Sequence, residues 1–215
     1  LPIAPVVPEA KRDAPPSAQA ESIVKTNIPA LEGPGGVDIG GIETREFGVT
    51  FATKEVWEQR QGRTLSDREV SDLTVEENST ILQRSMPGYS ELPAIIQAAV
   101  LDLSYNVGVT LLLDPLRSDT TLHRAVSEGW AGEVLFATLE YVVGDGGSVL
   151  GLARRRALNY NLAVTEPKLQ ITATEMRPDG SIWYFWGNLS KRPMLIVKRP
   201  PHSQEKPRKI NMAGG

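Results

Sequence analysis

The chain contains no cysteine and only two histidines among its 215 residues. The absence of cysteine excludes disulfides, thiolate metal ligands and a cysteine nucleophile, and it leaves the cellular compartment open. The histidines, His123 and His202, lie far apart and lack the spacing of zinc ligands. We therefore expect no metal site.

Long apolar runs and a strong net charge are also missing. No apolar run approaches the ~20 residues of a membrane-spanning helix, so we expect no membrane span. The net charge of -3 is too small to indicate a partner. Basic residues gather after Lys191, without the interleaved aromatic residues of a nucleic-acid-binding motif. We expect no specific nucleic-acid partner.

Proline content and hydrophobic periodicity divide the chain into four parts. Residues 1–18 hold five prolines, which indicates an extended arm. Residues 19–166 have helical periodicity and are predicted to form the main domain. Residues 167–199 alternate polar and apolar residues around a turn signal, which predicts a small β appendage. Residues 200–215 are predicted to form a basic tail.

Most of the predicted domain is helical. Helices are expected over 19–31, 53–61, 66–73, 74–86, 92–107, 110–116, 120–128, 130–143 and 149–164. The segment 92–107 is the most apolar and should be the core helix. With one β-hairpin between the first two helices, this is an α+β pattern.

The glycine-rich stretch Glu32–Thr50 is the candidate site. It places Glu32, Asp38 and Thr44 at six-residue steps. Repeated glycine favours tight turns between short strands, so we expect a hairpin here. A polar loop that follows a rigid helix is a suitable place for functional residues. The alternative is that Asp38 only caps a turn, as aspartates in such loops commonly do.

Two sequence blocks resemble the phage-type lysozymes, the muramidase family that includes many phage endolysins. The first has the pattern LEG…D-x-x-G-x-x-T-x-x-[FY]-G-[VHI] and begins at Leu31. The second is AVLDLSYNVG at 99–108, followed by GGSVLGLARRRALNYNL at 146–162. The resemblance covers roughly residues 20–164. Residues 51–77 also resemble a neighbouring peptidoglycan-hydrolase family with a GG-x-T-x-x-G-I-T hairpin, which acts on the same substrate.

The resemblance implies a lysozyme-like fold and a set of site residues. Glu32 would be the general acid, kept protonated by an apolar wall. Asp38 would bind or deprotonate a water that Thr44 helps to position, at a carboxyl separation of roughly 6.5–9.5 Å in an inverting enzyme. Asn106 and Phe47 are candidate substrate-binding residues.

Two departures from the family pattern affect the site. Five residues separate Glu32 from Asp38, where the family usually has eight. Asn159 stands where the family has an acid after the double arginine, so a salt bridge expected there is missing.

Two further clusters have structural alternatives. Arg155 and Arg156 are expected to be structural, or paired with hairpin acids such as Glu43 or Glu46, rather than catalytic. The aromatic run 183–186 is expected to be the packed face of a small sheet, with sugar stacking as the alternative.

The implied function is hydrolysis of the β-1,4 bond between N-acetylmuramic acid and N-acetylglucosamine in bacterial peptidoglycan, without a cofactor. Residues 1–18 and 167–215 would attach the enzyme to other phage virion or tail proteins, so that it acts in the host periplasm. Three alternatives stay open. The first is an endolysin held in the host cytoplasm before release, and the second is an inactive structural virion (tail) protein. The third is a lytic transglycosylase that needs only Glu32.

Overall fold

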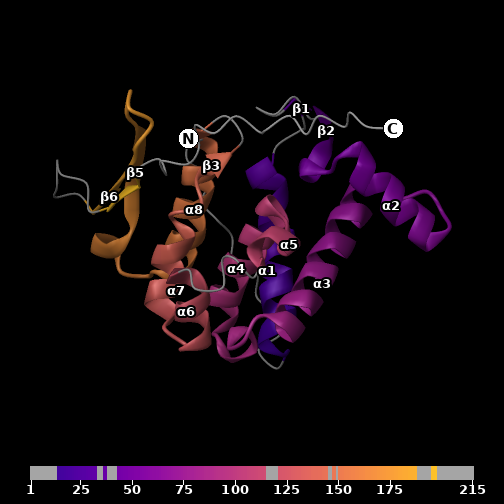
Figure 1. Ribbon diagram of the computed structural model, residues 1–215, viewed down its shortest axis with the longest axis horizontal. Helices are drawn as coiled ribbons and strands as arrows, with labels where there is room; N and C mark the ends of the chain where they lie inside the picture. The colour runs from indigo at the N-terminus through magenta and orange to yellow at the C-terminus, as the bar shows by residue number, and fades with distance from the viewer. Residues whose placement is uncertain are drawn as a thin grey trace, which may run out of the picture.

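The computed structural model describes residues 14–32, 36–37, 43–114, 121–144, 147–148, 150–187 and 195–197. These residues form a mainly helical α+β body with small antiparallel sheets (Figure 1). The α-helices are α1 (Pro16–Glu32), α2 (Phe51–Gln61), α3 (Asp67–Ser85), α4 (Ala94–Val107), α5 (Val109–Leu112), α6 (Thr121–Ser127), α7 (Ala131–Thr138) and α8 (Leu150–Ala163). Short 3-10 helices are η1 (Glu46–Gly48), η2 (Tyr89–Glu91) and η4 (Pro167–Leu169). No described helix is long and apolar enough to cross a membrane.

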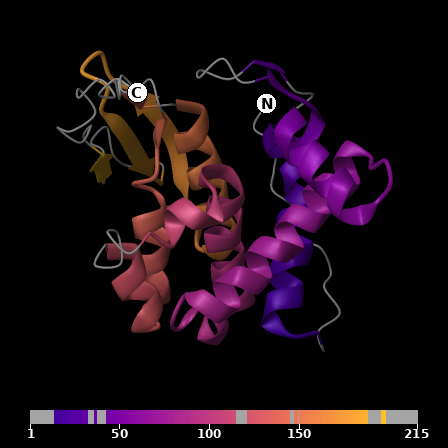
Figure 2. The same cartoon turned by 45° about the vertical axis from the view of Figure 1, so that its right-hand side comes forward.

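Helix α4 is the centre of the core. Nine consecutive residues of this helix, 96–104, are buried. A helix that is apolar on all sides must be covered on all sides, and α4 is in contact with α1, α3, α7 and α8. Figure 2 shows α4 between the N-terminal helices and the α7–α8 half of the molecule. The predicted core helix therefore holds the two halves together.

Helix α3 is one helix where the sequence predicts two. It begins at the predicted capping box, in which Ser66 and Glu69 bond to each other's backbone. The second start predicted at Thr74 is wrong, because that hydroxyl donates to the Val70 carbonyl at 2.8 Å and accepts from Trp57 Nε1 at 3.0 Å. A threonine bonded back into the preceding turn continues a helix rather than starting one.

Helix α1 also differs from its predicted bounds. It begins at Pro16, three residues inside the predicted arm, and continues through Pro29. Proline is well placed in a first turn, whereas in a helix interior it removes a backbone hydrogen bond. The apolar residues Ile23, Val24 and Ile28 are all buried, so packing maintains the helix through Pro29. The remainder of the predicted arm, 1–13, lies outside the described residues.

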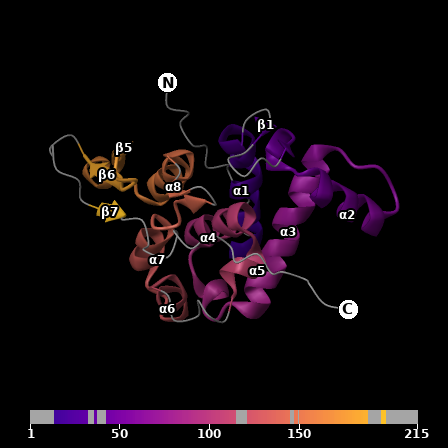
Figure 3. The same ribbon diagram turned by 45° about the horizontal axis from the view of Figure 1, so that its top comes forward.

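The C-terminal strands pack onto the helical body. Strands β5 (Ile171–Met176), β6 (Ile182–Trp186) and β7 (Leu195–Val197) form an antiparallel sheet in the order β5-β6-β7 (Figure 3). Alternate β6 residues are buried in the same core cluster as α4. The Tyr184 hydroxyl donates to the Leu139 carbonyl at 3.0 Å. Tyr184 and Trp186 of the aromatic run therefore form a packed sheet face that extends the main core, whereas Trp183 and Phe185 are half-buried outside it.

Two short strand pairs complete the described elements. Strand β1 (Gly36–Val37) pairs antiparallel with β2 (Glu43–Thr44), directly after α1. Strand β3 (Val143–Gly144) pairs with β4 (Gly147–Ser148), so α7 ends earlier than predicted. The predicted tail, 200–215, lies outside the described residues.

Candidate active site

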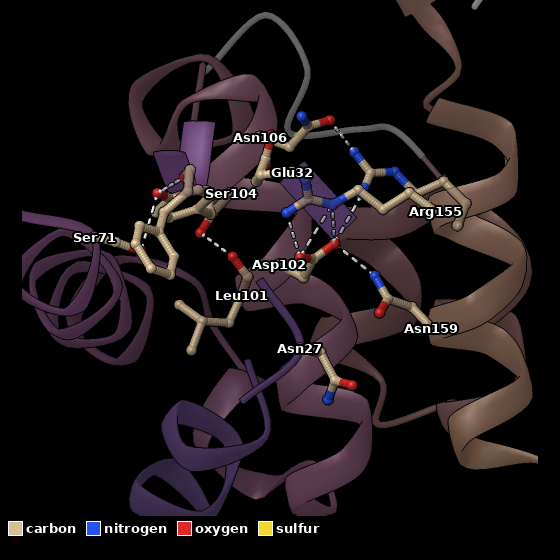
Figure 4. A network of polar contacts seen from close by, with 12 residues as sticks. Asn27, Glu32, Ser71, Leu101, Asp102, Ser104, Asn106, Arg155 and Asn159 are labelled. Carbon is tan, nitrogen blue, oxygen red and sulfur yellow. Dashed lines mark hydrogen bonds and ion pairs between the residues drawn. The ribbon is translucent and has the colours of Figure 1, made fainter. Parts of the chain in front are cut away.

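Glu32 is the last residue of α1, and its side chain is 18% exposed. Its carboxylate forms an ion pair with Nη1 of Arg155 (Figure 4). On another side it lies against Gly48, where an added Cβ would be 2.7 Å from Glu32 Cδ and Oε2. Among the described residues, Glu32 thus faces a guanidinium and a bare stretch of backbone.

The backbone of η1 is folded to pass this close to Glu32. Phe47 and Gly48 have φ values of 61° and 70°, both left-handed. A non-glycine residue in this region is strained, so neighbouring contacts must hold it there. The Tyr105 hydroxyl supplies one, because it donates to the Phe47 carbonyl at 2.6 Å and contacts Ser71 Oγ at 3.1 Å. Burial raises the pKa of Tyr105 to about 12, so the hydroxyl stays a donor at neutral pH.

Arg155 connects Glu32 to the protein core. Its Nε donates to both Asp102 oxygens, at 2.9 and 3.2 Å, and its Nη2 donates to Oδ1 at 2.6 Å. This bidentate contact takes up one edge of the guanidinium. The remaining nitrogen, Nη1, is bonded to Glu32.

Asp102 on α4 is the centre of the buried network in Figure 4. Besides Arg155, it accepts from Arg156 Nη1 at 3.0 Å and from Asn159 Nδ2 at 2.5 Å. Arg156 Nη2 also donates to the side-chain oxygen of Asn106 at 2.6 Å. Asn159 therefore acts as a donor to a carboxylate on another helix.

Charge balance keeps this network ionised. Burial on its own would raise the pKa of Asp102. The pKa is nevertheless below its usual value, because Arg155 stabilises the carboxylate by its charge and hydrogen bonds, and Arg156 stabilises it by its charge. Burial lowers the pKa of Arg156 to about 10, which still leaves it charged at neutral pH. Arg155 therefore pairs with both Asp102 and Glu32, and Arg156 pairs with Asp102. Both arginines are buried.

The predicted site residues fall into three groups. Arg155 bonds Glu32 and Arg156 bonds Asn106, and both arginines are joined to Asp102. Tyr105 bonds the backbone carbonyl of Phe47, which precedes the Gly48 that lies against Glu32. Thr44 is placed in β2, opposite Gly36. Asp38 lies outside the described residues.

Sequence reasoning missed the roles of Asp102 and Tyr105. The sequence does contain a signal for Asp102, because it is the one charged residue in the mostly apolar segment 92–107. A buried charge requires a partner, and the double arginine supplies it 53 and 54 positions along the chain. Among the described residues, no group of three acidic or histidine side chains is placed to bind a metal ion.

Comparisons with known proteins add little. No protein-family model and no curated protein matches the chain. Among solved structures, it is similar to the active form of the P1 phage endolysin Lyz, with a TM-score of 0.48 and 17% sequence identity. The alignment covers 69% of this chain and 86% of that one. At this TM-score and identity, the likeness carries no argument about activity.

Proposed function

We propose that the chain is a lysozyme-like glycoside hydrolase that cleaves the β-1,4 bond between N-acetylmuramic acid and N-acetylglucosamine in bacterial peptidoglycan. The supporting observation is that the two sequence blocks meet at Glu32. Gly48 of the first block lies against its carboxylate, and Arg155 of the second block is paired with it. A partly exposed acid at a helix end is thus paired with a residue 123 positions along the chain.

Glycoside hydrolysis requires an acid that protonates the leaving oxygen. In the proposed mechanism Glu32 gives up this proton, and Arg155 stabilises the carboxylate that forms. Asp38 would hold the attacking water, with Thr44 bonded to that water. Asn106 would contact a sugar through Nδ2, because Arg156 already occupies its Oδ1.

The biological setting is proposed from the sequence. Residues 1–18 and 167–215 would bind other virion or tail proteins, so that the enzyme opens the wall from the periplasmic side during infection. A lytic transglycosylase is the second candidate, since that reaction needs only Glu32. An inactive virion protein is the third, because of the shortened Glu32–Asp38 spacing.

The test is the clearing of purified peptidoglycan by the wild type and by Glu32→Gln. This change keeps the size of the side chain and removes the acid. Glu46→Gln is the matched control, because Glu46 is an exposed acid in the same block. We expect the wild type and Glu46→Gln to clear the suspension and Glu32→Gln to lose at least ~100-fold in rate.

The other results of the clearing test support the alternatives. A folded wild type that does not clear the wall would support the inactive virion protein. Equal clearing by Glu32→Gln would show that another residue is the acid. If the first result holds, Asp38→Asn is the next variant, and its activity decides whether the shortened spacing still places the second carboxylate.

A further inference from the structure

Asp102 is a buried carboxylate that the proposed mechanism does not use. It is 2% exposed and belongs to α4, the central core helix. Burying a charge is costly unless it is paired and fully hydrogen-bonded. Asp102 meets this condition with three donors, Arg155, Arg156 and Asn159.

The geometry of Arg155 makes Asp102 more than a core ion pair. A guanidinium is planar, and its donors have fixed relative directions. Asp102 occupies Nε and Nη2, which leaves Nη1 for Glu32. The direction of Nη1 therefore depends on where Asp102 holds the opposite edge.

Asp102 also reduces the positive charge that acts on Glu32. Among the described residues, Glu32 faces Arg155 of α8 and the uncharged Gly48 of η1, and it interacts electrostatically with Tyr105 of α4 and with Arg156. Asp102 lies against both arginines, so it offsets part of their positive charge. Without it, Arg155 would hold the Glu32 carboxylate more strongly, since charges interact strongly in a poorly solvated site.

We propose that Asp102 is a positioning residue for Glu32. It acts through Arg155, by aiming Nη1 at the Glu32 carboxylate and by offsetting the arginine charge so that Glu32 can take up the proton that it later donates. This inference rests on the proposed function, because it assumes that Glu32 is the general acid.

The test is the pH profile of peptidoglycan clearing by Asp102→Asn. We expect the alkaline limb to move to lower pH by about one unit, which corresponds to roughly a tenfold loss of rate on that limb. The loss should be smaller at acid pH, where Glu32 is more readily protonated. Asn159→Ala is the matched control, because it removes one bond to the same carboxylate and changes no charge. Its alkaline limb should stay at the wild-type pH.

A charge-balanced variant covers the case in which Asp102→Asn does not fold. Asp102→Asn combined with Arg156→Gln removes one buried acid and one buried base, and leaves Arg155 with Glu32 alone. A smaller shift of the alkaline limb in the same direction is expected, because the loss of the Arg156 charge offsets part of the loss of Asp102, while Arg155 no longer shares its charge with Asp102. If neither variant folds, Asp102 is a structural residue and the inference is overturned.

The outcomes separate this inference from the proposed function. If the wild type clears the wall and the alkaline limb of a folded Asp102 variant is unmoved, the inference alone fails. A loss of rate that is equal at every pH has the same consequence, because it indicates general damage to the site. If the wild type does not clear the wall at any pH, the proposed function fails, and the inference fails with it.

Discussion

At Gly48 the backbone leaves no room for even one methyl group beside Glu32. An added Cβ would lie 2.7 Å from the carboxyl carbon, closer than real Cβ contacts allow. The φ of 70° at Gly48 also favours glycine on its own account. The shape of the site therefore depends on a residue that carries no side chain.

Gly48→Ala should consequently remove activity while the protein still folds. We expect a stability loss of about 1 kcal/mol from the left-handed backbone, and a loss of wall-clearing activity because the Glu32 carboxylate is displaced. Gly62→Ala is the control, because Gly62 has a φ of 65° and its added Cβ would meet no atom within 4 Å. It should lose similar stability, measured by thermal melting, and keep its activity. Equal activity of the two variants would contradict the geometry described for Glu32.

Individual residues were predictable where a motif or an unusual residue type marked them. The glycine-rich block singled out Glu32 and the end of the apolar helix singled out Asn106, and the two residues are bonded to Arg155 and Arg156 respectively. The partners were not predictable, because hydrogen bonds such as that from Tyr105 to Phe47 join positions 58 residues apart. Periodicity describes one element at a time and contains no information on which helices meet.

At the scale of elements, β6 shows how a short strand is fixed to the helical body. The Trp186 ring packs against Tyr160 and Phe136, with ring centroids 5.8 and 6.0 Å away, and its Nε1 donates to the Tyr160 hydroxyl at 3.2 Å. Trp183, three positions earlier, has its ring beside Arg177 instead. The two tryptophans of one strand therefore have different surroundings.

Replacing each tryptophan by alanine should give different losses of stability. Trp186→Ala removes a buried ring from the shared core and should lower the free energy of unfolding by about 3 kcal/mol. Trp183→Ala removes a half-buried ring and should cost about 1 kcal/mol. Urea unfolding of the two variants measures the difference. Equal losses would mean that the sheet is not anchored through Trp186.

Most elements were predictable from local signals, and the exceptions have local causes. The capping box at Ser66 predicted the start of α3 correctly. The break predicted at Thr74 failed because the same residue types that cap helices also bond backwards within them. Pro16 was assigned to the arm on composition, although proline is also suited to a first helical turn.

At the scale of the whole molecule, the Asp102 network ties α4 to α8 and, through Arg155, to the end of α1. Its contribution to stability should depend on pH. The pKa of Asp102 is lowered in the folded protein, so the carboxylate stabilises the fold above its unfolded pKa of about 3.9. This contribution is lost as the pH falls through the lowered folded pKa.

Asp102→Asn should therefore destabilise the protein most at neutral pH. We expect a loss of about 3 kcal/mol in unfolding free energy at pH 7, since a buried ion network loses one of its acids. The difference from the wild type should shrink below about pH 4, where the Asp102 carboxyl of the unfolded wild-type chain begins to take up a proton. Urea unfolding at pH 7 and pH 3 measures it. A difference that grows on acidification would show that Asp102 is not held ionised by its arginines.

The arrangement of the whole chain was the least predictable level. The sequence indicated that residues after 167 form strands, because their period changes. It did not indicate that Ile182, Tyr184 and Trp186 would join the core built by α4. Composition separates segments of different character, but the contacts that unite them depend on three-dimensional packing.

The most direct test of the account is the chemistry of the ends released from purified peptidoglycan. The wild type should release fragments with reducing N-acetylmuramic acid ends, and Glu32→Gln should release almost none at the same protein concentration. Reducing-end labelling and mass analysis of the fragments measure both. Anhydro-muramic ends would identify a transglycosylase instead, and the absence of any new ends with the folded wild type would contradict the proposal that Glu32 is the acid of a hydrolase.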